Sequence, residues 1–223
     1  MTEWWTYSPA DFLLFSPRVY YRLFELHNET MWPAQFLTLG LGLVVLLLML
    51  RSTPSASRWT AAILGALWIW VAWSFLWERY ATINWAMTYV APVFAAQGLF
   101  LIWFGAIRAR LQLVQARTFA WWGAIALLAA AVMLYPTLAP LQGRPWSGAE
   151  VFGIVADPTA VATLAFLALV RRGPWLMIIP AVWCLLSSET LWLLQADDFF
   201  IPAGAAAATI VLRWTQSDRQ ASA

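Results

Sequence analysis

Long apolar runs constrain this chain more than any other feature of its sequence. A helix of about 20 apolar residues is long enough to span the ~30 Å hydrocarbon core of a bilayer. Hydrophobic residues make up 62% of the chain and charged residues 11%, which lies outside the usual balance of soluble domains. We therefore predict an all-α, polytopic membrane protein with seven transmembrane helices. The predicted spans are 32–50, 59–77, 81–107, 119–135, 150–170, 174–194 and 199–213.

The residues before the first span have a different character. Residues 1–31 mix aromatic and charged side chains, and Ser8-Pro9 and Ser16-Pro17 each place a serine N-cap before a proline at the first helical position. We predict interfacial helices over 1–31, a transmembrane domain over 32–214 and a short cytoplasmic tail over 215–223.

The arginines predict the orientation of the chain. By the positive-inside rule, the side with more basic residues faces the cytoplasm. This places the N-terminus outside and the C-terminus in the cytoplasm. The nine inner arginines are Arg51, Arg58, Arg108, Arg110, Arg117, Arg171, Arg172, Arg213 and Arg219, and the four outer ones are Arg18, Arg22, Arg79 and Arg144.

The acids show the opposite bias. Eight of the eleven lie on the outer side, which gives that side a net charge of four minus eight, or −4. An acidic mouth concentrates cations, although a hydrated acidic surface explains the same count.

The residue types that are missing exclude several chemistries. All 13 basic residues are arginines, so no lysine is present to form a Schiff base with retinal or pyridoxal. Cys184 and His27 are the single cysteine and the single histidine, which excludes an intrachain disulfide, a multi-cysteine metal site and an intrachain bis-histidine haem. We expect neither a cofactor nor a metal. His27 is interpreted as a solvated side chain on an interfacial helix, with a metal gate as the less favoured alternative.

The seven spans also suggest an internal repeat. The pattern E-x7-P-x4-T-L starts at Glu25 and again at Glu150. A three-one-three division would give two parallel triplets, the plan of sugar transporters of the SWEET class. Chance matches are common in a sequence so rich in Ala and Leu.

Two acids fall within predicted spans. Asp157 lies 14 residues before Arg171 and Glu189 lies 15 residues after Pro174, so both are ~21–22 Å from the inner boundary. Ionisable residues inside the membrane usually face a partner or a water-filled cavity. We predict that Asp157 and Glu189 share a proton or solute site with Thr159, and that Glu150 stands at its mouth.

Pro158 has no N–H, which frees the carbonyl of Ile154 as a further acceptor. The alternative is that each acid pairs with an arginine and holds helices together. A second group would form an outer mouth, or else cap and neutralise a tight loop: Glu78, Arg79, Asn84 and Arg144.

Three blocks of sequence resemble a bacterial membrane-protein family of unknown function, of about this length. They are D-F-L-L-F-S-P-R-V-Y-Y-R-L-F-E-L at 11–26, R-Y-A-T-I-N-W-A at 79–86, and G-R-P-W through A-E-V-F-G-I-V-A-D-P-T at 143–159. The resemblance covers the whole chain. It implies a bacterial inner membrane and brings no activity with it.

The function predicted from these observations is a transporter or channel for a small polar or cationic solute, coupled to protons through the intramembrane acids. The alternative is a non-catalytic membrane subunit or scaffold. We find no nucleophile–base pair and no HExxH motif, which argues against an enzyme. The expected partners are the lipid bilayer and the solute, with a second copy or another membrane protein as the alternative and with no nucleic acid.

Overall fold

The computed structural model describes residues 15–115 and 117–221, and its regular structure there is helical. A short helix, α1 (Pro17–Met31), precedes α2 (Ala34–Arg51). The next helix, α3 (Pro54–Val71), continues through a π-helical stretch at Ala72–Trp77, and α4 (Met87–Phe100) does the same at Leu101–Ile107. The remaining helices are α5 (Phe119–Ala129, with a π-helical continuation at Ala130–Leu134), α6 (Leu138–Leu141), α7 (Ala156–Ala168), α8 (Ile178–Leu193) and α9 (Phe200–Ala221).

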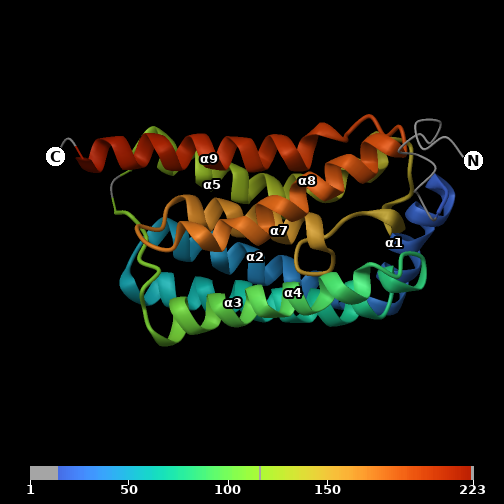
Figure 1. The fold of residues 1–223 in the computed structure, drawn as a ribbon, viewed down its shortest axis with the longest axis horizontal. Coiled ribbons are helices and arrows are strands. Elements are labelled where there is room, and N and C mark those ends of the chain that lie inside the picture. The colour runs from blue at the N-terminus through green and yellow to red at the C-terminus, as the bar shows by residue number, and fades with distance from the viewer. Residues whose placement is uncertain (1–14, 116, 222–223) are drawn as a thin grey trace, which may run out of the picture.

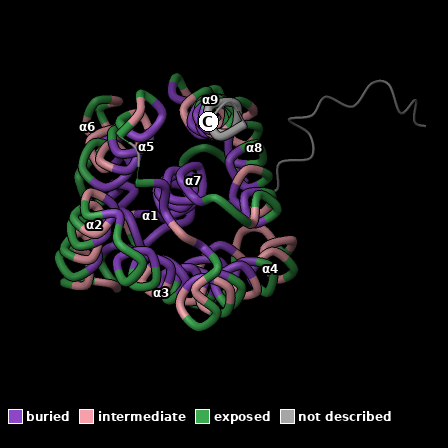
Figure 2. Tube along the Cα trace, turned by 90° about the vertical axis from the view of Figure 1, so that its left-hand side faces the viewer, coloured by how far each residue is buried: buried purple, intermediate pink, exposed green. Residues whose placement is uncertain are grey.

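Helix α7 lies at the centre of the molecule. Figure 2 shows it enclosed by α2, α3, α4, α5, α8 and α9, and Figure 1 shows these helices running alongside one another. All thirteen residues of α7 are buried. Trp68 on α3 donates an indole hydrogen bond to the hydroxyl of Thr163 on α7 at 2.7 Å, so the contact includes polar as well as apolar groups.

Five helical segments are long and apolar enough to cross a membrane, which supports the predicted membrane class. They are Ala34–Arg51, Pro54–Thr82, Met87–Ile107, Phe119–Leu141 and Pro174–Leu193. The predicted count of seven is not confirmed. The 13 residues of α7 extend only ~20 Å at 1.5 Å per residue. Helix α9 is 22 residues long but is not among the segments apolar enough to cross.

The connecting segments gather at two opposite ends. At the arginine-rich end, the backbone N–H of Leu113 donates to Ser57 Oγ at 3.1 Å and that of Arg171 donates to the Gln112 carbonyl at 3.1 Å. At the other end, called the arginine-poor end below, Asn28 Nδ2 donates to the Ser147 carbonyl at 2.7 Å. The loops that contain most of the arginines therefore lie together.

Helix α1 lies at the arginine-poor end, against the segment that leads into α7 (Figures 1 and 2). Its start matches the predicted signal, because Ser16 Oγ accepts from the N–H of Val19 at 3.4 Å and Pro17 is the first helical residue. The other predicted start, at Ser8, lies outside the described residues.

The predicted repeat is not confirmed by this arrangement. It required α2 and α7 to hold equivalent places in two triplets. Instead α7 lies at the centre and α2 lies in the surrounding ring (Figure 2).

Candidate functional site

The chain approaches α7 through a buried segment that is not helical. Residues 149–155, the approach segment, are all buried, and the helix begins only at Ala156. Gly153 has φ +73°, a conformation that interrupts any helix here. The prediction of one continuous helix over 150–170 is therefore wrong for residues 150–155. Non-helical backbone at membrane depth occurs where it is buried in protein or lines a cavity.

His27 reaches across from α1 to the approach segment. Its Nε2 lies 3.2 Å from the Ile154 carbonyl oxygen. A carbonyl can only accept, so Nε2 must carry the proton, and Nδ1 of the neutral ring is then an acceptor. The acceptor expected at Ile154 is present, and His27 occupies it. Burial lowers the pKa of His27 to about 4, so the ring is neutral at pH 7. The interpretation of His27 as a solvated side chain is wrong, because its exposed fraction is 0%.

Asp157 stands in the first turn of α7, where the helix dipole favours a negative charge. Three donors from two other elements converge on its carboxylate. Trp183 Nε1 donates to Oδ1 at 2.7 Å, and the hydroxyls of Ser187 and Tyr135 donate to Oδ2. A carboxylate offers about four acceptor positions, so most of those on Asp157 are occupied by protein.

Thr159 connects the approach segment to the helix through two hydrogen bonds. Its hydroxyl accepts from the N–H of Gly153 at 2.9 Å and donates to the carbonyl of Val155 at 2.7 Å. With both contacts made within the chain, Thr159 fixes the shape of the approach rather than offering a free hydroxyl.

Glu150 lies near the start of the approach segment, at the arginine-poor end, with a charged pair beside it. Only 5% of Glu150 is exposed, and its carboxylate lies within electrostatic range of Asp157, Arg144 and Asp198. Arg144 Nη2 is 3.8 Å from Asp198 Oδ2, and the guanidinium lies over the ring of Tyr21 at 4.3 Å. Glu150 Oε2, Asp198 Oδ1 and Arg144 Nη1 are buried without a hydrogen-bond partner among the described residues. These three residues are called the Glu150 cluster below.

Glu189 does not join this group, which corrects the predicted pairing of two acids. It lies on an exposed position of α8, whereas its neighbours Ser187 and Ser188 are buried. Equal depth along two helices says nothing about the direction in which a side chain points. The acids within electrostatic range of Asp157 are Glu150 and Asp198 instead.

The predicted outer-mouth residues separate into different roles. Arg79 donates to the hydroxyl of Thr30 on α1, and Asn84 Oδ1 accepts from the N–H of Ala86 at 3.1 Å. Glu78 is exposed. Asn84 therefore caps a tight turn, and only Arg144 of this group belongs to the Glu150 cluster.

The sequence model of a family of unknown function (DUF6064) matches residues 17–223. The chain belongs to this family. The resemblance predicted from the three sequence blocks is thereby confirmed, and the DUF6064 match extends over nearly the whole chain. No curated protein and no solved structure matched.

Several site residues of this DUF6064 member were not predicted from the sequence: His27, Tyr135, Trp183, Ser187 and Asp198. A signal for His27 was present, because the buried positions of α1 are 20, 23, 24, 27 and 28, the spacing of one helix face. Within the described residues, no group of three or more His, Cys, Asp or Glu side chains is placed to hold a metal ion.

Proposed function

We propose that this membrane protein carries a small polar or cationic solute, and that the solute binds at the arginine-poor end of α7. The proposal depends on one observation, a concentration of buried polar atoms that have no hydrogen-bond partner among the described residues. Such atoms in folded proteins are normally paired with protein, water or a ligand. Seven such atoms occur among the described residues, and five of them lie at the arginine-poor end. These five are His27 Nδ1, Gln35 Oε1, Arg144 Nη1, Glu150 Oε2 and Asp198 Oδ1.

The chemistry of these atoms indicates what would bind. Four of the five are acceptors, since Nδ1 of His27 accepts when Nε2 donates, and only Arg144 Nη1 is a donor. A site rich in acceptors that includes two carboxylates suits a proton, a small cation or a solute with several N–H or O–H groups. Glu150 is assigned the central role because its Oε2 is both buried and unpartnered.

Asp157 has a different role in this proposal. Its oxygens already accept from Trp183, Ser187 and Tyr135. We therefore assign it as the fixed charge that makes the site attractive to cations, and not as the group that the solute contacts first. Thr159 keeps the approach segment in place.

The backbone supports a transport role. In many transporters, solute sites lie where a membrane helix is interrupted and its half-helix end points into the site. Helix α7 has this form, because its N-terminus lies inside the ring and a buried non-helical segment precedes it. The location that we propose is the bacterial inner membrane, with the arginine-poor end and the N-terminus in the periplasm and with α7 and α9 also traversing the bilayer.

One observation favours the alternative, a non-catalytic subunit or scaffold. Asp157 is so fully bonded within the chain that it joins α7 to α8 and to the end of α5, as a purely structural acid would. On this alternative, the molecule would move no solute.

A flux measurement distinguishes the transport proposal from the scaffold alternative. Proteoliposomes loaded with a pH-sensitive dye would be given a proton gradient, and the same preparation would be tested with Na⁺, K⁺ and ammonium. We expect wild-type protein to dissipate at least one gradient faster than protein-free liposomes, and Glu150→Gln to remove the difference. The exposed Glu189 provides the matched control, because Glu189→Gln should retain full flux. Wild-type protein that moves none of these ions would reject the transport of protons and small cations.

A further inference from the structure

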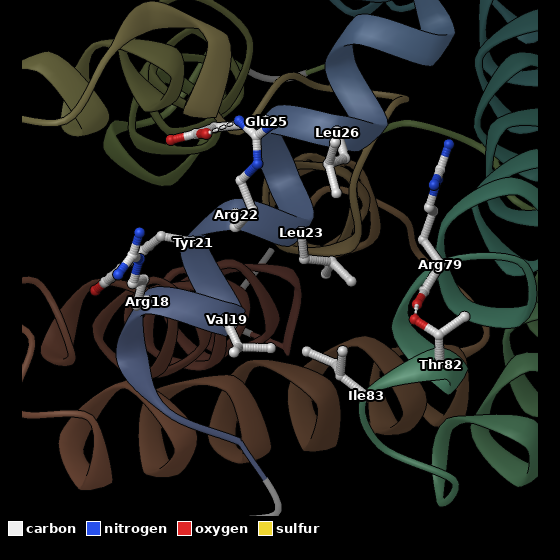
Figure 3. A pocket seen from close by; sticks show the side chains of 10 residues that line it. All are labelled: Arg18, Val19, Tyr21, Arg22, Leu23, Glu25, Leu26, Arg79, Thr82 and Ile83. Carbon is white, nitrogen blue, oxygen red and sulfur yellow. Dashed lines mark hydrogen bonds and ion pairs between the residues drawn. The ribbon is translucent and has the colours of Figure 1, made fainter.

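A groove separates α1 from the turn between α3 and α4 at the arginine-poor end. Its volume is about 630 Å³. The side chains of Val19, Leu23 and Ile83 lie in the gap between the two segments, as Figure 3 shows, and Leu26 extends the same apolar floor. The polar residues of the groove are Arg18, Tyr21, Arg22, Glu25, Arg79 and Thr82.

The groove holds three of the four arginines predicted for this side of the molecule. Against them stands one acid, Glu25, so the lining carries a net charge of three minus one, or +2. This is the reverse of the side as a whole, which is net −4 by sequence. Arg22 pairs with Glu25, and Arg79 donates to Thr30. Arg18 has no ion pair or hydrogen bond among the described residues and is exposed.

The surroundings of the groove place it at the level of lipid headgroups. Trp77, Trp85 and Tyr89 lie on or beside the same turn, and their exposed fractions are 46%, 63% and 70%. Exposed tryptophan and tyrosine side chains are enriched at the membrane–water interface. Arg79 beside this apolar floor matches the two parts of a phospholipid, its phosphate and its acyl chain.

We propose that this groove binds an anionic phospholipid of the outer leaflet. The phosphate is held by Arg79, which lies on the same side of α1 as Val19 and Leu23 (Figure 3) and can donate charge-assisted hydrogen bonds to its oxygens. The first part of one acyl chain lies on Val19, Leu23, Leu26 and Ile83. The proposal does not rest on transport, because none of these residues belongs to the Glu150 cluster.

The experiment measures lipid binding to the detergent-purified protein by native mass spectrometry. Phosphatidylglycerol, phosphatidylcholine and inorganic phosphate would be titrated in parallel. We expect phosphatidylglycerol to bind more tightly than phosphatidylcholine. Inorganic phosphate should show no measurable binding and should not compete with the lipid. Arg79→Gln should weaken phosphatidylglycerol binding about fivefold, the factor equivalent to ~1 kcal/mol for one arginine near an anionic surface.

Two control variants keep the result specific. Arg51 is an exposed arginine at the opposite end, so Arg51→Gln should leave lipid binding unchanged. Val19→Thr alters only the apolar floor, where Val19 is 43% exposed, and should weaken lipid binding without affecting folding. The proposal is overturned if Arg51→Gln loses as much lipid as Arg79→Gln, if Val19→Thr has no effect, or if inorganic phosphate competes as well as the lipid does.

Discussion

The indole N–H of Trp183 donates to Oδ1 of Asp157 at 2.7 Å and so ties α8 to the first turn of the central helix. The ring also packs edge-on against Phe94 of α4, with 4.9 Å between the ring centroids. Because Trp183 is only 6% exposed, this single side chain joins three helices inside the ring. Much of the position of α7 therefore depends on one acid and its donors.

Replacing Trp183 tests that dependence. Trp183→Phe keeps an aromatic ring but removes the donor, and a hydrogen bond to a charged group contributes roughly 1.5–3 kcal/mol. We expect a clearly lowered melting temperature in detergent. Trp192→Phe is the control on the same helix, because Trp192 is 56% exposed and should change stability by less than about 0.5 kcal/mol.

A double-mutant cycle separates the hydrogen bond from the lost ring volume. If the bond carries the effect, Asp157→Asn should cost less in the Trp183→Phe background than in the wild type. Strictly additive losses would show that Trp183 acts through packing alone.

His27 predicts a dependence of stability on pH. Its pKa is about 4 in the folded protein against 6.5 as the ordinary value, because burial disfavours the charged ring. Between these values the unfolded chain binds more protons than the folded chain, so stability falls as pH is lowered from 6.5 to 4. At 1.36 kcal/mol per pKa unit, the loss reaches about 2 kcal/mol by pH 5.

The measurement compares melting temperatures at pH 7 and pH 5. His27 is the only histidine, so the variant His27→Gln isolates its contribution. Glutamine can still donate to the Ile154 carbonyl but does not titrate. We expect the wild type to lose stability over this interval and His27→Gln to lose much less. An equal loss in both proteins would assign the effect to the carboxylates.

The sequence was sufficient to predict the membrane class and the grouping of the loops. Long apolar runs identify membrane helices by length alone, and the loops around Ser57, Gln112 and Arg171 do meet at one end. The start of α7 was not predictable in this way. The stretch from Val151 to Val155 is apolar whether or not it is helical, so hydropathy cannot distinguish a spanning helix from a buried loop that leads into a shorter one.

The direction in which side chains point on the membrane helices was also not predictable from the sequence. In a buried or lipid-exposed helix both faces are apolar, and the periodicity that reveals a core face disappears. Glu189 was therefore placed beside Asp157 on depth alone, although Ser187 is the residue of α8 that reaches it. On the amphipathic α1 the periodicity survives, and there it does identify His27 as inward-facing.

The orientation of the molecule can be tested with reporters. The nine-to-four division of arginines predicts a cytoplasmic C-terminus. After residue 223, a reporter that works in the cytoplasm should be active and one that works in the periplasm should not. In the 142–145 turn, the opposite result is expected. The same compartment for both would contradict the proposed crossing of the bilayer by α7 and α9.

Substitutions at three glycines test how tightly the approach segment is packed. Gly153 lies in that segment, and Gly143 and Gly40 serve as comparisons. Gly153 and Gly143 both have φ +73°, but a Cβ at Gly153 would meet Leu67 and Thr38 side-chain atoms at 3.0 Å, whereas one at Gly143 would meet nothing within 4 Å. Gly40, in the helical interior of α2, has no positive φ and also has open space.

Alanine at these positions should therefore give three different outcomes. Gly40→Ala should stabilise α2 by roughly 0.5–1 kcal/mol, since glycine is the poorer helix residue. Gly143→Ala should cost about 1 kcal/mol for the left-handed backbone alone. Gly153→Ala adds crowding in a packed interior, which costs about 1–3 kcal/mol more. Melting temperatures of the three variants provide the measurement. If Gly153→Ala lowered the melting temperature no more than Gly143→Ala does, residues 149–155 would not be tightly packed beside Thr38 and Leu67.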